Sequence, residues 1–463
     1  MTPPGGSDER ERLRRLTELD RRHLWHPFTQ MEEWEREDPP IMVDRSEGAY
    51  LIDVEGRRYF DGVSSLWVNL HGHRREEIDA AIRGQLSRVA HSTQLGMGSP
   101  PAIELAARLA EIAPEGLARV FYSDSGATAV EIALKMAFQY QRQRRPARPG
   151  KSRFLALNLA YHGDTVGAVS LGGIGLFHGT FGPLLFDTLR AETAYCYHCP
   201  RGAEKGPCPV CAGEEIESLI AGNAGTLAAV VIEPMIQAAG GMIVHPPEFL
   251  RRVAAACAAH DVLLIADEVA TGFGRTGRMF ACEHVGVAPD ILCLAKGMTG
   301  GYLPLAATLA TEEIFDAFRG APDSGRAFYH GHSYTGNPLG CAAALANLDV
   351  FEKDRTLEGL RPKIGALWKR LEGLRSLPAV GEVRGIGLMA GVELVADRET
   401  RAPYPYGERA GLRVCQAARR RGLAVRPLGD VLVLMPPYCA GEEEIGWMVE
   451  VIGESIEEAA ARF

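Results

Sequence analysis

The sequence lacks the features that direct a protein to a membrane or out of the cell. No apolar run approaches the roughly 18 residues that a spanning helix needs. Residues 1–15 are charged and have no apolar centre, which argues against a signal peptide. A basic excess is also missing: the net charge is -9, and an acidic chain repels nucleic acid and anionic lipid. We therefore expect a soluble, cytoplasmic protein whose partners are small molecules, and neither nucleic acid nor membrane.

The length of 463 residues exceeds what one simple hydrophobic core usually holds, which predicts two domains. From about residue 100, short apolar runs alternate with segments of helical periodicity. This alternation is typical of an α/β fold, in which helices cover both faces of a mostly parallel sheet. The expected strands cover residues 119–122, 154–157, 227–232, 262–266 and 291–295, and the clearest helices cover residues 127–140 and 247–260.

The two ends of the chain differ from this central block. Residues 50–60 carry strand-like side chains around a turn, and residues 357–371 and 406–422 have helical periodicity. We predict that residues 76–340 form a large domain. Residues 1–75 and 341–463 are expected to build a smaller α+β domain together.

A first candidate site follows the expected strand at residues 119–122. The stretch Tyr-Ser-Asp-Ser-Gly-Ala-Thr at residues 122–128 leads directly into a helix. The free N–H groups and the positive dipole end of a helix N-terminus favour a phosphate, which Ser125, Gly126 and Ala127 would cradle. The alternative is that Ser125 only caps the helix.

Two further motifs end apolar strands with a charged side chain. Asp267 lies at the carboxyl end of its strand, where α/β proteins bind ligands, and a buried carboxylate there needs a cationic partner. A protonated pyridine nitrogen would serve, and so would an arginine. Lys296 follows the next strand and precedes a glycine-rich turn. A desolvated amine in that place becomes nucleophilic, whereas the simpler alternative is a surface lysine.

One glycine pattern imitates a dinucleotide-binding motif. Residues 272–277 match G-x-G-x-x-G, but residues 267–270 separate them from the strand and no clear amphipathic helix opens after them. We interpret the pattern as a loop that presents Arg275.

Histidines and cysteines also form patterns that could bind a metal. The triplets at residues 71–73 and 330–332 read His-Gly-His, which in loops more often tethers backbone than binds metal. The pairs Cys196/Cys199 and Cys208/Cys211 would complete a tetrahedral zinc site, although the gap between them is short for a zinc ribbon. The alternative is a loop with reduced or occasionally oxidised thiols. We expect no catalytic metal in either case.

Together, these motifs resemble the class III aminotransferases, a fold-type-I family that depends on pyridoxal phosphate. The resemblance covers nearly the whole chain and is strongest at residues 264–277 and 290–297, which fix the order and spacing of Asp267 and Lys296. Within the family, the chain is similar to the biotin-pathway branch, which transfers an amino group to 8-amino-7-oxononanoate. The segments that indicate this branch are residues 24–29, 64–67, 161–165, 280–284 and 426–429.

The resemblance implies how the cofactor is held. Lys296 would bind pyridoxal phosphate covalently through its amine and then move the proton at the reacting carbon. Asp267 would pair with the pyridine nitrogen, while Tyr161 and Val269 would lie on opposite faces of the ring. Ser125, Gly126 and Ala127 would hold the phosphate. Ser333 would reach the phosphate of a neighbouring subunit, which implies a homodimer with its active sites at the interface.

The same resemblance implies the substrate-binding residues. Arg426 would bind the carboxylate of the keto acid, and the cleft would be lined by Phe28, Trp67, Asp164 and Arg275. Phe28 stands where many members of this branch have tyrosine, and Ser333 replaces a threonine but keeps the hydroxyl.

The amino donor stays open between S-adenosylmethionine and L-lysine. Val433 stands where some users of S-adenosylmethionine carry an aromatic residue. Together with Phe28, this residue favours lysine as the amino donor. The alternative function is another ω-aminotransferase of the family, acting on 4-aminobutyrate, ornithine or β-alanine, against which residues 24–29 argue. A zinc-dependent binding module around the four cysteines is a third hypothesis.

Overall fold

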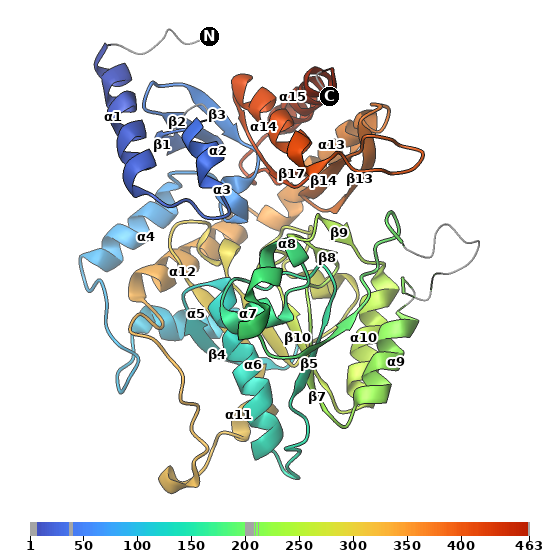
Figure 1. Cartoon of the computed structure of the whole chain (residues 1–463). Helices are drawn as coiled ribbons and strands as arrows, with labels where there is room; N and C mark the ends of the chain where they lie inside the picture. Colours follow the sequence, from blue (N-terminus) through green and yellow to red (C-terminus); the bar gives the residue numbers. More distant parts are fainter. Residues whose placement is uncertain (1–6, 37–39, 200–207, 209, 212, 462–463) are drawn as a thin grey trace.

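The computed structural model describes residues 7–36, 40–199, 208, 210, 211 and 213–461 (Figure 1). Its centre is a seven-stranded sheet with the order β4-β12-β11-β10-β7-β5-β6. Neighbouring strands run parallel except at β12, which is antiparallel to both β11 and β4. The strands are β4 (Leu117–Ser123), β5 (Arg153–Leu157), β6 (Thr188–Ala191), β7 (Leu227–Ile232), β10 (Leu263–Asp267), β11 (Ile291–Leu294) and β12 (Ala306–Thr311). The predicted α/β class with a mostly parallel sheet is confirmed.

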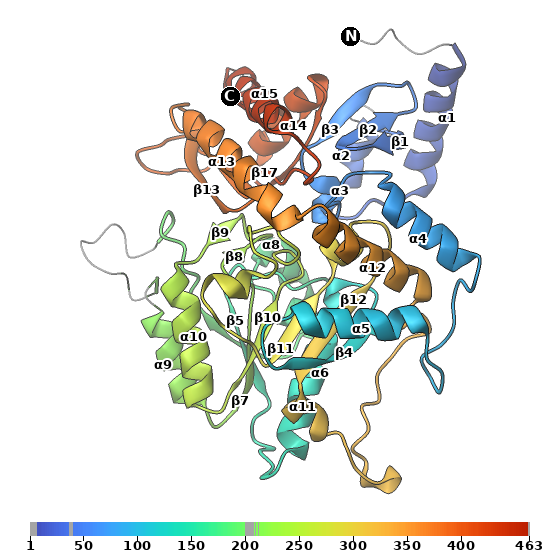
Figure 2. The same ribbon diagram turned by 180° about the vertical axis from the view of Figure 1, so that it is seen from behind.

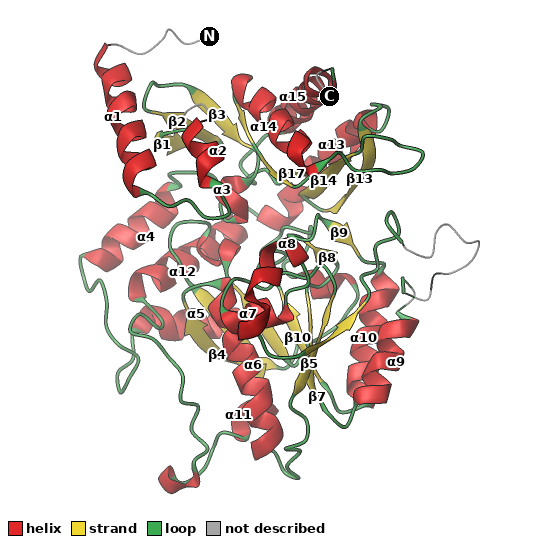
Figure 3. Cartoon of the chain, in the orientation of Figure 1, coloured by secondary structure: helices red, strands yellow, loops and turns green. Residues whose placement is uncertain are grey.

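Helices cover both faces of this sheet because its strands are apolar on both sides (Figure 3). Alternate residues of one strand point to opposite faces. In β5, Phe154 and Ala156 lie in one core cluster with α6, whereas Leu155 and Leu157 lie in another with α9 and α10. The helices of this block are α4 (Glu76–Leu86), α5 (Pro100–Ile112), α6 (Gly126–Gln143), α7 (Val166–Leu171), α8 (Gly175–His178), α9 (Glu214–Asn223), α10 (Pro247–Ala259), α11 (Glu312–Asp316) and α12 (Pro338–Lys353).

The two ends of the chain come together on one side of the sheet (Figures 1 and 2). In the N-terminal part lie α1 (Ser7–His23), α2 (Met31–Arg36), β1 (Val43–Glu47), β2 (Tyr50–Asp53), β3 (Arg58–Asp61) and α3 (Ser64–Trp67). In the C-terminal part lie α13 (Thr356–Leu374), β13 (Val380–Ile386), β14 (Met389–Leu394), α14 (Ala410–Arg420), β15 (Leu423–Ala424), β16 (Arg426–Leu428), β17 (Val431–Leu434) and α15 (Glu442–Ala460).

Two small sheets organise these ends. The first has the order β1-β2-β3-β15, and its last pairing is parallel, with Phe60 opposite Leu423. The second, β13-β14-β17-β16, is antiparallel throughout. The first sheet therefore joins strands from both ends of the chain. The expected boundary at residue 340 falls inside α12, and the division into two domains at residues 75 and 340 stays a prediction.

The connections that matter for the site are short. A two-stranded ribbon of β8 (Ile236–Gln237) and β9 (Ile243–Val244) follows β7, and a 3-10 turn, η3 (Lys296–Thr299), follows β11. Within the described residues, no helix combines the length and apolar character needed to span a bilayer.

Candidate active site

A cavity of about 730 Å³ opens where the parallel strands end. Its wall is supplied by the residues that directly follow β4, β5, β7, β10 and β11. The carboxyl ends of parallel strands meet at one edge of a sheet, so side chains far apart in sequence converge there. Of the predicted site residues, this cavity brings together Lys296, Asp267, Tyr161, Ser125, Gly126, Ala127, Val269, Trp67 and Asp164.

Lys296 occupies a strained turn at the end of β11. Its φ of 36° lies in the left-handed region, where a residue with a β-carbon is disfavoured, and such strain often marks functional positions. The Nζ atom lies 4.7 Å from the centre of the Trp67 ring. No hydrogen bond or ion pair to this amine forms within the described part of the chain. Burial lowers the pKa of Lys296, while Asp267 and Glu233 act in the opposite direction. The amine is thus available for chemistry.

Asp267 is fixed at the end of β10 and is only 4% exposed. Its Oδ2 atom lies 2.7 Å from Nδ1 of the buried His162, and its Oδ1 accepts a hydrogen bond from the backbone N–H of Val269 at 3.1 Å. The alternative of an arginine partner is not realised among the residues that the structure describes, where the ion-pair partner is His162. One imidazole holds this carboxylate beside the cavity.

A second buried carboxylate, Glu233, lies beside this pair and was not predicted. It follows β7 and accepts hydrogen bonds from the backbone N–H groups of Tyr161, at 3.2 Å, and of Ala238, at 2.9 Å. Burial, reinforced by the charge of Asp267, raises the pKa of Glu233 to about 7. His162 was also missed as a site residue. The strand-end rule that found Asp267 applies equally to Glu233 and could have found it.

The N-terminus of α6 forms one wall of the cavity. Ser125 caps this 18-residue helix: its Oγ accepts the backbone N–H of Thr128 at 3.3 Å, and the Thr128 hydroxyl accepts the backbone N–H of Ser125 at 3.1 Å. A β-carbon on Gly126 would lie 2.6 Å from Cγ1 of Val269, so only glycine allows this close approach. Ser125 therefore caps the helix, and the positive end of the helix dipole faces the cavity.

Tyr161 and Trp67, together with Tyr302, supply aromatic side chains to the lining. The Tyr161 hydroxyl donates a hydrogen bond to Oδ2 of Asp164 at 2.7 Å. Burial raises the pKa of Tyr161, and that hydrogen bond adds to the effect. The phenol therefore stays protonated at neutral pH.

Arg275 lies outside the cavity lining and is 1% exposed. Its guanidinium donates to the carbonyl oxygens of Pro436, at 3.1 Å, and Asn69, at 3.0 Å. The loop at residues 272–277 consists of turns, as expected, but it buries Arg275 instead of presenting it to a ligand. The arginine joins three distant segments of the backbone.

Three other predicted residues also lie apart from the cavity lining. Phe28 is 56% exposed, and its ring contacts Phe177, which in turn contacts Tyr161, with centre-to-centre distances of 5.2 and 6.3 Å. Arg426 is exposed on β16, and Ser333 is exposed in the connection before α12. A single chain therefore leaves these side chains at or beyond the edge of the site.

Of the histidines in the His-Gly-His triplets, His332 holds backbone, as expected, whereas His73 and His330 contact charged side chains. His73 lies 3.1 Å from a carboxylate oxygen of Asp61. His332 accepts the backbone N–H of Tyr334 at 3.2 Å. His330 lies 2.9 Å from the Lys135 amine.

The residues present fit pyridoxal phosphate. That group needs an amine to hold it, an anion to face its ring nitrogen, a helix N-terminus for its phosphate and a flat wall for its ring. Lys296, Asp267, the start of α6 and Tyr161 meet these needs, and all of them line the one cavity. The buried amine of Lys296, which has no ionic partner among the described residues, is the observation that this group explains.

Comparison with known proteins agrees with the cofactor that the cavity residues fit. The sequence matches the family described as Aminotransferase class-III over residues 31–456. The adenosylmethionine-8-amino-7-oxononanoate aminotransferase of Nitratidesulfovibrio vulgaris is 57% identical over 455 residues, which cover 98% of this chain and 83% of the relative. The protein of that name from Geobacter sulfurreducens is 54% identical over 442 residues, covering 95% and 97%.

Solved structures are similar over nearly the full length as well. The crystal structure of the adenosylmethionine-8-amino-7-oxononanoate aminotransferase of Methanocaldococcus jannaschii superimposes with a TM-score of 0.91 at 47% identity, covering 96% of this chain and 99% of that one. An amine transaminase from an uncultivated Pseudomonas species, in its PLP-bound form, has a TM-score of 0.88 at 40% identity, covering 95% and 98%. The chain therefore belongs to the class-III aminotransferases, and pyridoxal phosphate is its cofactor.

Proposed function

We propose that the protein is a 7,8-diaminononanoate synthase, which transfers an amino group to 8-amino-7-oxononanoate in biotin biosynthesis. The observation that carries the proposal is the identity of 48–57% to relatives named for that reaction, over 95% or more of this chain. The amine and the carboxylate of the cavity supply the chemistry that such a reaction requires.

Bound pyridoxal phosphate supplies an aldehyde for the amine and a conjugated ring that accepts the electron pair of a broken C–H bond. Lys296 holds the group and, once its amine is free, takes a proton from the reacting carbon or returns one to it. Burial lowers the pKa of this amine, which raises the fraction able to accept a proton at neutral pH.

Asp267 keeps the ring nitrogen protonated. A negative charge beside a pyridinium stabilises the proton on it, and burial strengthens that interaction. His162, at 2.7 Å, orients the carboxylate of Asp267 and is its positioning residue. Glu233 accepts the backbone N–H groups of Tyr161 and Ala238, and it therefore positions the backbone that carries Tyr161.

Tyr161 and Val269 bound the two faces of the ring, and Ser125, Gly126 and Ala127 hold the phosphate at the start of α6. The support is that all five line the same cavity. The helix dipole and the free N–H groups of the first turn favour a phosphate there.

The keto acid enters past Trp67 and Asp164, with Arg426 binding its carboxylate and Phe28 bounding the entrance. Trp67 and Asp164 line the cavity. Phe28 connects to Tyr161 through the Phe177 ring, which supports a place at the entrance. Arg275, whose guanidinium is buried on the carbonyl oxygens of Asn69 and Pro436, holds these two backbone segments together rather than contacting substrate.

The active enzyme is a homodimer in the cytoplasm, in which Ser333 of one subunit completes the phosphate site of the other. The exposure of Ser333 supports this role, because in one chain it lies away from the cavity. Two large side chains on nearby loops, Leu95 and Tyr329, are 84% and 80% exposed. Exposed apolar side chains of this kind favour a face that a second subunit covers.

The amino donor is S-adenosylmethionine or L-lysine. The relatives' printed name favours the first. Val433, which lies in one core cluster with Trp67 and is not aromatic, and Phe28, which has no phenol hydroxyl, favour L-lysine.

The decisive experiment supplies purified holoenzyme with 8-amino-7-oxononanoate and each donor in a separate reaction. We expect 7,8-diaminononanoate, detected by mass spectrometry, with one donor only, and ping-pong kinetics from the two half-reactions. Absence of the diamine with both donors refutes the proposal. A parallel screen with 4-aminobutyrate, ornithine and β-alanine against pyruvate and 2-oxoglutarate identifies the ω-aminotransferase alternative.

A further inference from the structure

Two thiol pairs lie in the connection between β6 and α9, outside the active site. The Sγ atoms of Cys196 and Cys211 are 2.8 Å apart, and those of Cys199 and Cys208 are 3.7 Å apart. The pairs are nested, with the outer residue of one C-x-x-C motif facing the outer residue of the other. None of these four cysteines forms a disulfide in the structure.

The Cys196–Cys211 distance favours a dithiol over a metal site, whereas the Cys199–Cys208 distance is close to the spacing of metal ligands. In a tetrahedral zinc–thiolate site with bonds of about 2.3 Å, all sulfurs lie roughly 3.8 Å apart. The Cys196–Cys211 separation is about 1 Å shorter than that. Among the residues that the structure describes, no three His, Cys, Asp or Glu side chains are arranged to hold a metal ion. The sulfurs of the closer pair are nearer to bonding distance than to ligand spacing.

The thiols differ in access and ionisation. Cys196 is exposed, while the other three are partly buried. A hydrogen bond from the Cys211 backbone lowers the pKa of Cys208, and burial raises the pKa of the Cys211 thiol. A reagent in solution therefore reaches Cys196 first, and Cys211 lies next to it.

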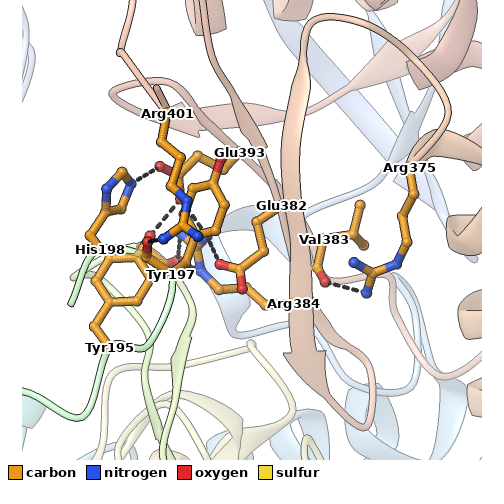
Figure 4. A network of polar contacts seen from close by, with 10 residues as sticks. Tyr195, Tyr197, His198, Arg375, Glu382, Val383, Arg384, Glu393 and Arg401 are labelled. Atoms are coloured by element: carbon orange, nitrogen blue, oxygen red, sulfur yellow. Dashed lines mark hydrogen bonds and ion pairs between the residues drawn. The ribbon is translucent and has the colours of Figure 1, made fainter. Parts of the chain in front are cut away.

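The segment that carries Cys196 is clamped onto the C-terminal part of the chain (Figure 4). The Tyr195 hydroxyl donates to Glu393 at 2.5 Å, and His198 contacts the other oxygen of the same carboxylate. Arg384, itself paired with Glu393, donates through Nε to the Gly241 carbonyl at 2.9 Å. Gly241 follows Ala238 and Ala239 of the cavity wall, so the clamp connects the thiol segment to that wall.

We propose that Cys196 and Cys211 form a reversible disulfide that fixes this clamp. With a low-molecular-weight disulfide as oxidant, the Cys196 thiolate attacks one of its sulfurs and releases the first thiol. The Cys211 thiolate then attacks the Cys196 sulfur and releases the second thiol. The protons of the two cysteines go to the leaving thiolates, so two thiols are oxidised while one disulfide is reduced.

The cross-link restricts the unfolded chain, since it closes a loop from residue 196 to residue 211. It also keeps Tyr195 and His198 next to Glu393. We expect oxidation to raise the melting temperature and to leave the secondary structure unchanged. Reduction should restore the original value, which makes the site responsive to the thiol–disulfide balance of its surroundings.

The test uses full-length holoenzyme incubated with oxidised glutathione or with a phosphine reductant. Intact mass should fall by two hydrogens on oxidation, and non-reducing peptide mapping should join the peptides of Cys196 and Cys211. The melting temperature should rise by about 2 °C. Cys196→Ser should abolish both changes. Cys439→Ser, which removes an exposed thiol elsewhere, should keep both.

Three results would overturn the proposal. One is stoichiometric zinc in the purified protein with all four thiols protected from alkylation. Another is a link within a C-x-x-C motif or between Cys199 and Cys208 instead. The third is an unchanged mass after oxidation. None of these results bears on the aminotransferase activity, so the two proposals fail independently.

Discussion

The floor of the cavity and its rim are built in different ways. The floor, formed by Lys296, Asp267, His162 and Glu233, stands at the ends of buried strands or directly beside them. The rim that we propose, with Phe28, Ser333 and Arg426, is exposed and comes from segments outside the central sheet. A rigid sheet can fix an amine and a carboxylate to within a fraction of an ångström, whereas exposed side chains are free to adapt. We therefore expect substitutions in the floor to abolish the reaction, and substitutions in the rim to change which substrate is accepted.

The largest effect should come from Lys296→Ala. The variant keeps the cavity but loses the amine that holds the cofactor and moves the proton, so kcat should fall by at least about 10³-fold. Steady-state transamination rates and the visible absorbance of the holoenzyme measure this. Lys369→Ala, on the exposed surface of α13, is the control. If the two variants had comparable rates, Lys296 would not take part in the reaction.

Asp267→Asn should lower kcat by about 10²-fold, because the shape stays and the charge facing the ring nitrogen is lost. His162 keeps a partner in the amide oxygen, so the melting temperature should change less than the rate. The control is Asp323→Asn at an exposed turn. If the variant lost stability and activity in proportion, Asp267 would be structural.

Glu233→Gln should change how stability depends on pH. The folded-state pKa of about 7 lies above the ordinary 4.5, so the folded protein binds this proton more tightly than the unfolded chain. The contribution of Glu233 to the free energy of unfolding is therefore fully present below pH 4.5 and is lost as the pH rises toward 7. Between pH 5 and 7 the loss is about 2 kcal/mol in the wild type, and the glutamine variant should lack it.

Denaturant unfolding of the holoenzyme at several pH values measures this difference. The exposed Glu248→Gln on α10 should leave the pH profile as it is in the wild type. Parallel profiles for the wild type and Glu233→Gln would show that Glu233 is ionised throughout this range.

The smallest effect belongs to the rim. Arg426→Ala should raise KM for the keto acid by about tenfold and leave kcat within about twofold, since a carboxylate contact made equally before and during the reaction affects binding alone. Arg361→Ala, exposed on α13, should change neither constant. A fall in kcat as large as that of Asp267→Asn would erase the distinction between floor and rim.

Two of the four floor residues, Lys296 and Asp267, could be predicted because they follow local rules. The five strands predicted for the central block exist, and Lys296 and Asp267 lie where strand ends place ligands. Two strands of the sheet, β6 and β12, were missed. The Ala-Ala-Thr-Leu-Ala-Thr sequence of β12 has weak β-propensity, and an antiparallel strand interrupts the expected alternation.

The rest of the site depends on contacts that sequence spacing does not encode. Arg275 was expected in the substrate cleft, yet its partners are carbonyl oxygens at residues 69 and 436, far away in the chain. His162 meets Asp267 across 105 positions. Ser333 and Arg426 lie on segments whose place depends on tertiary packing, so their roles stay predictions.

The parallel pairing of Phe60 with Leu423 sets the order in which the protein can be assembled. During synthesis on the ribosome, β3 emerges long before β15 exists, so this edge of the first small sheet must wait for almost the whole chain. Contacts between such distant positions form slowly, because a long loop must close first. The sheet that joins the two ends is therefore completed only once β15 has been synthesised, and a chain that stops before β15 leaves one edge of β3 unpaired.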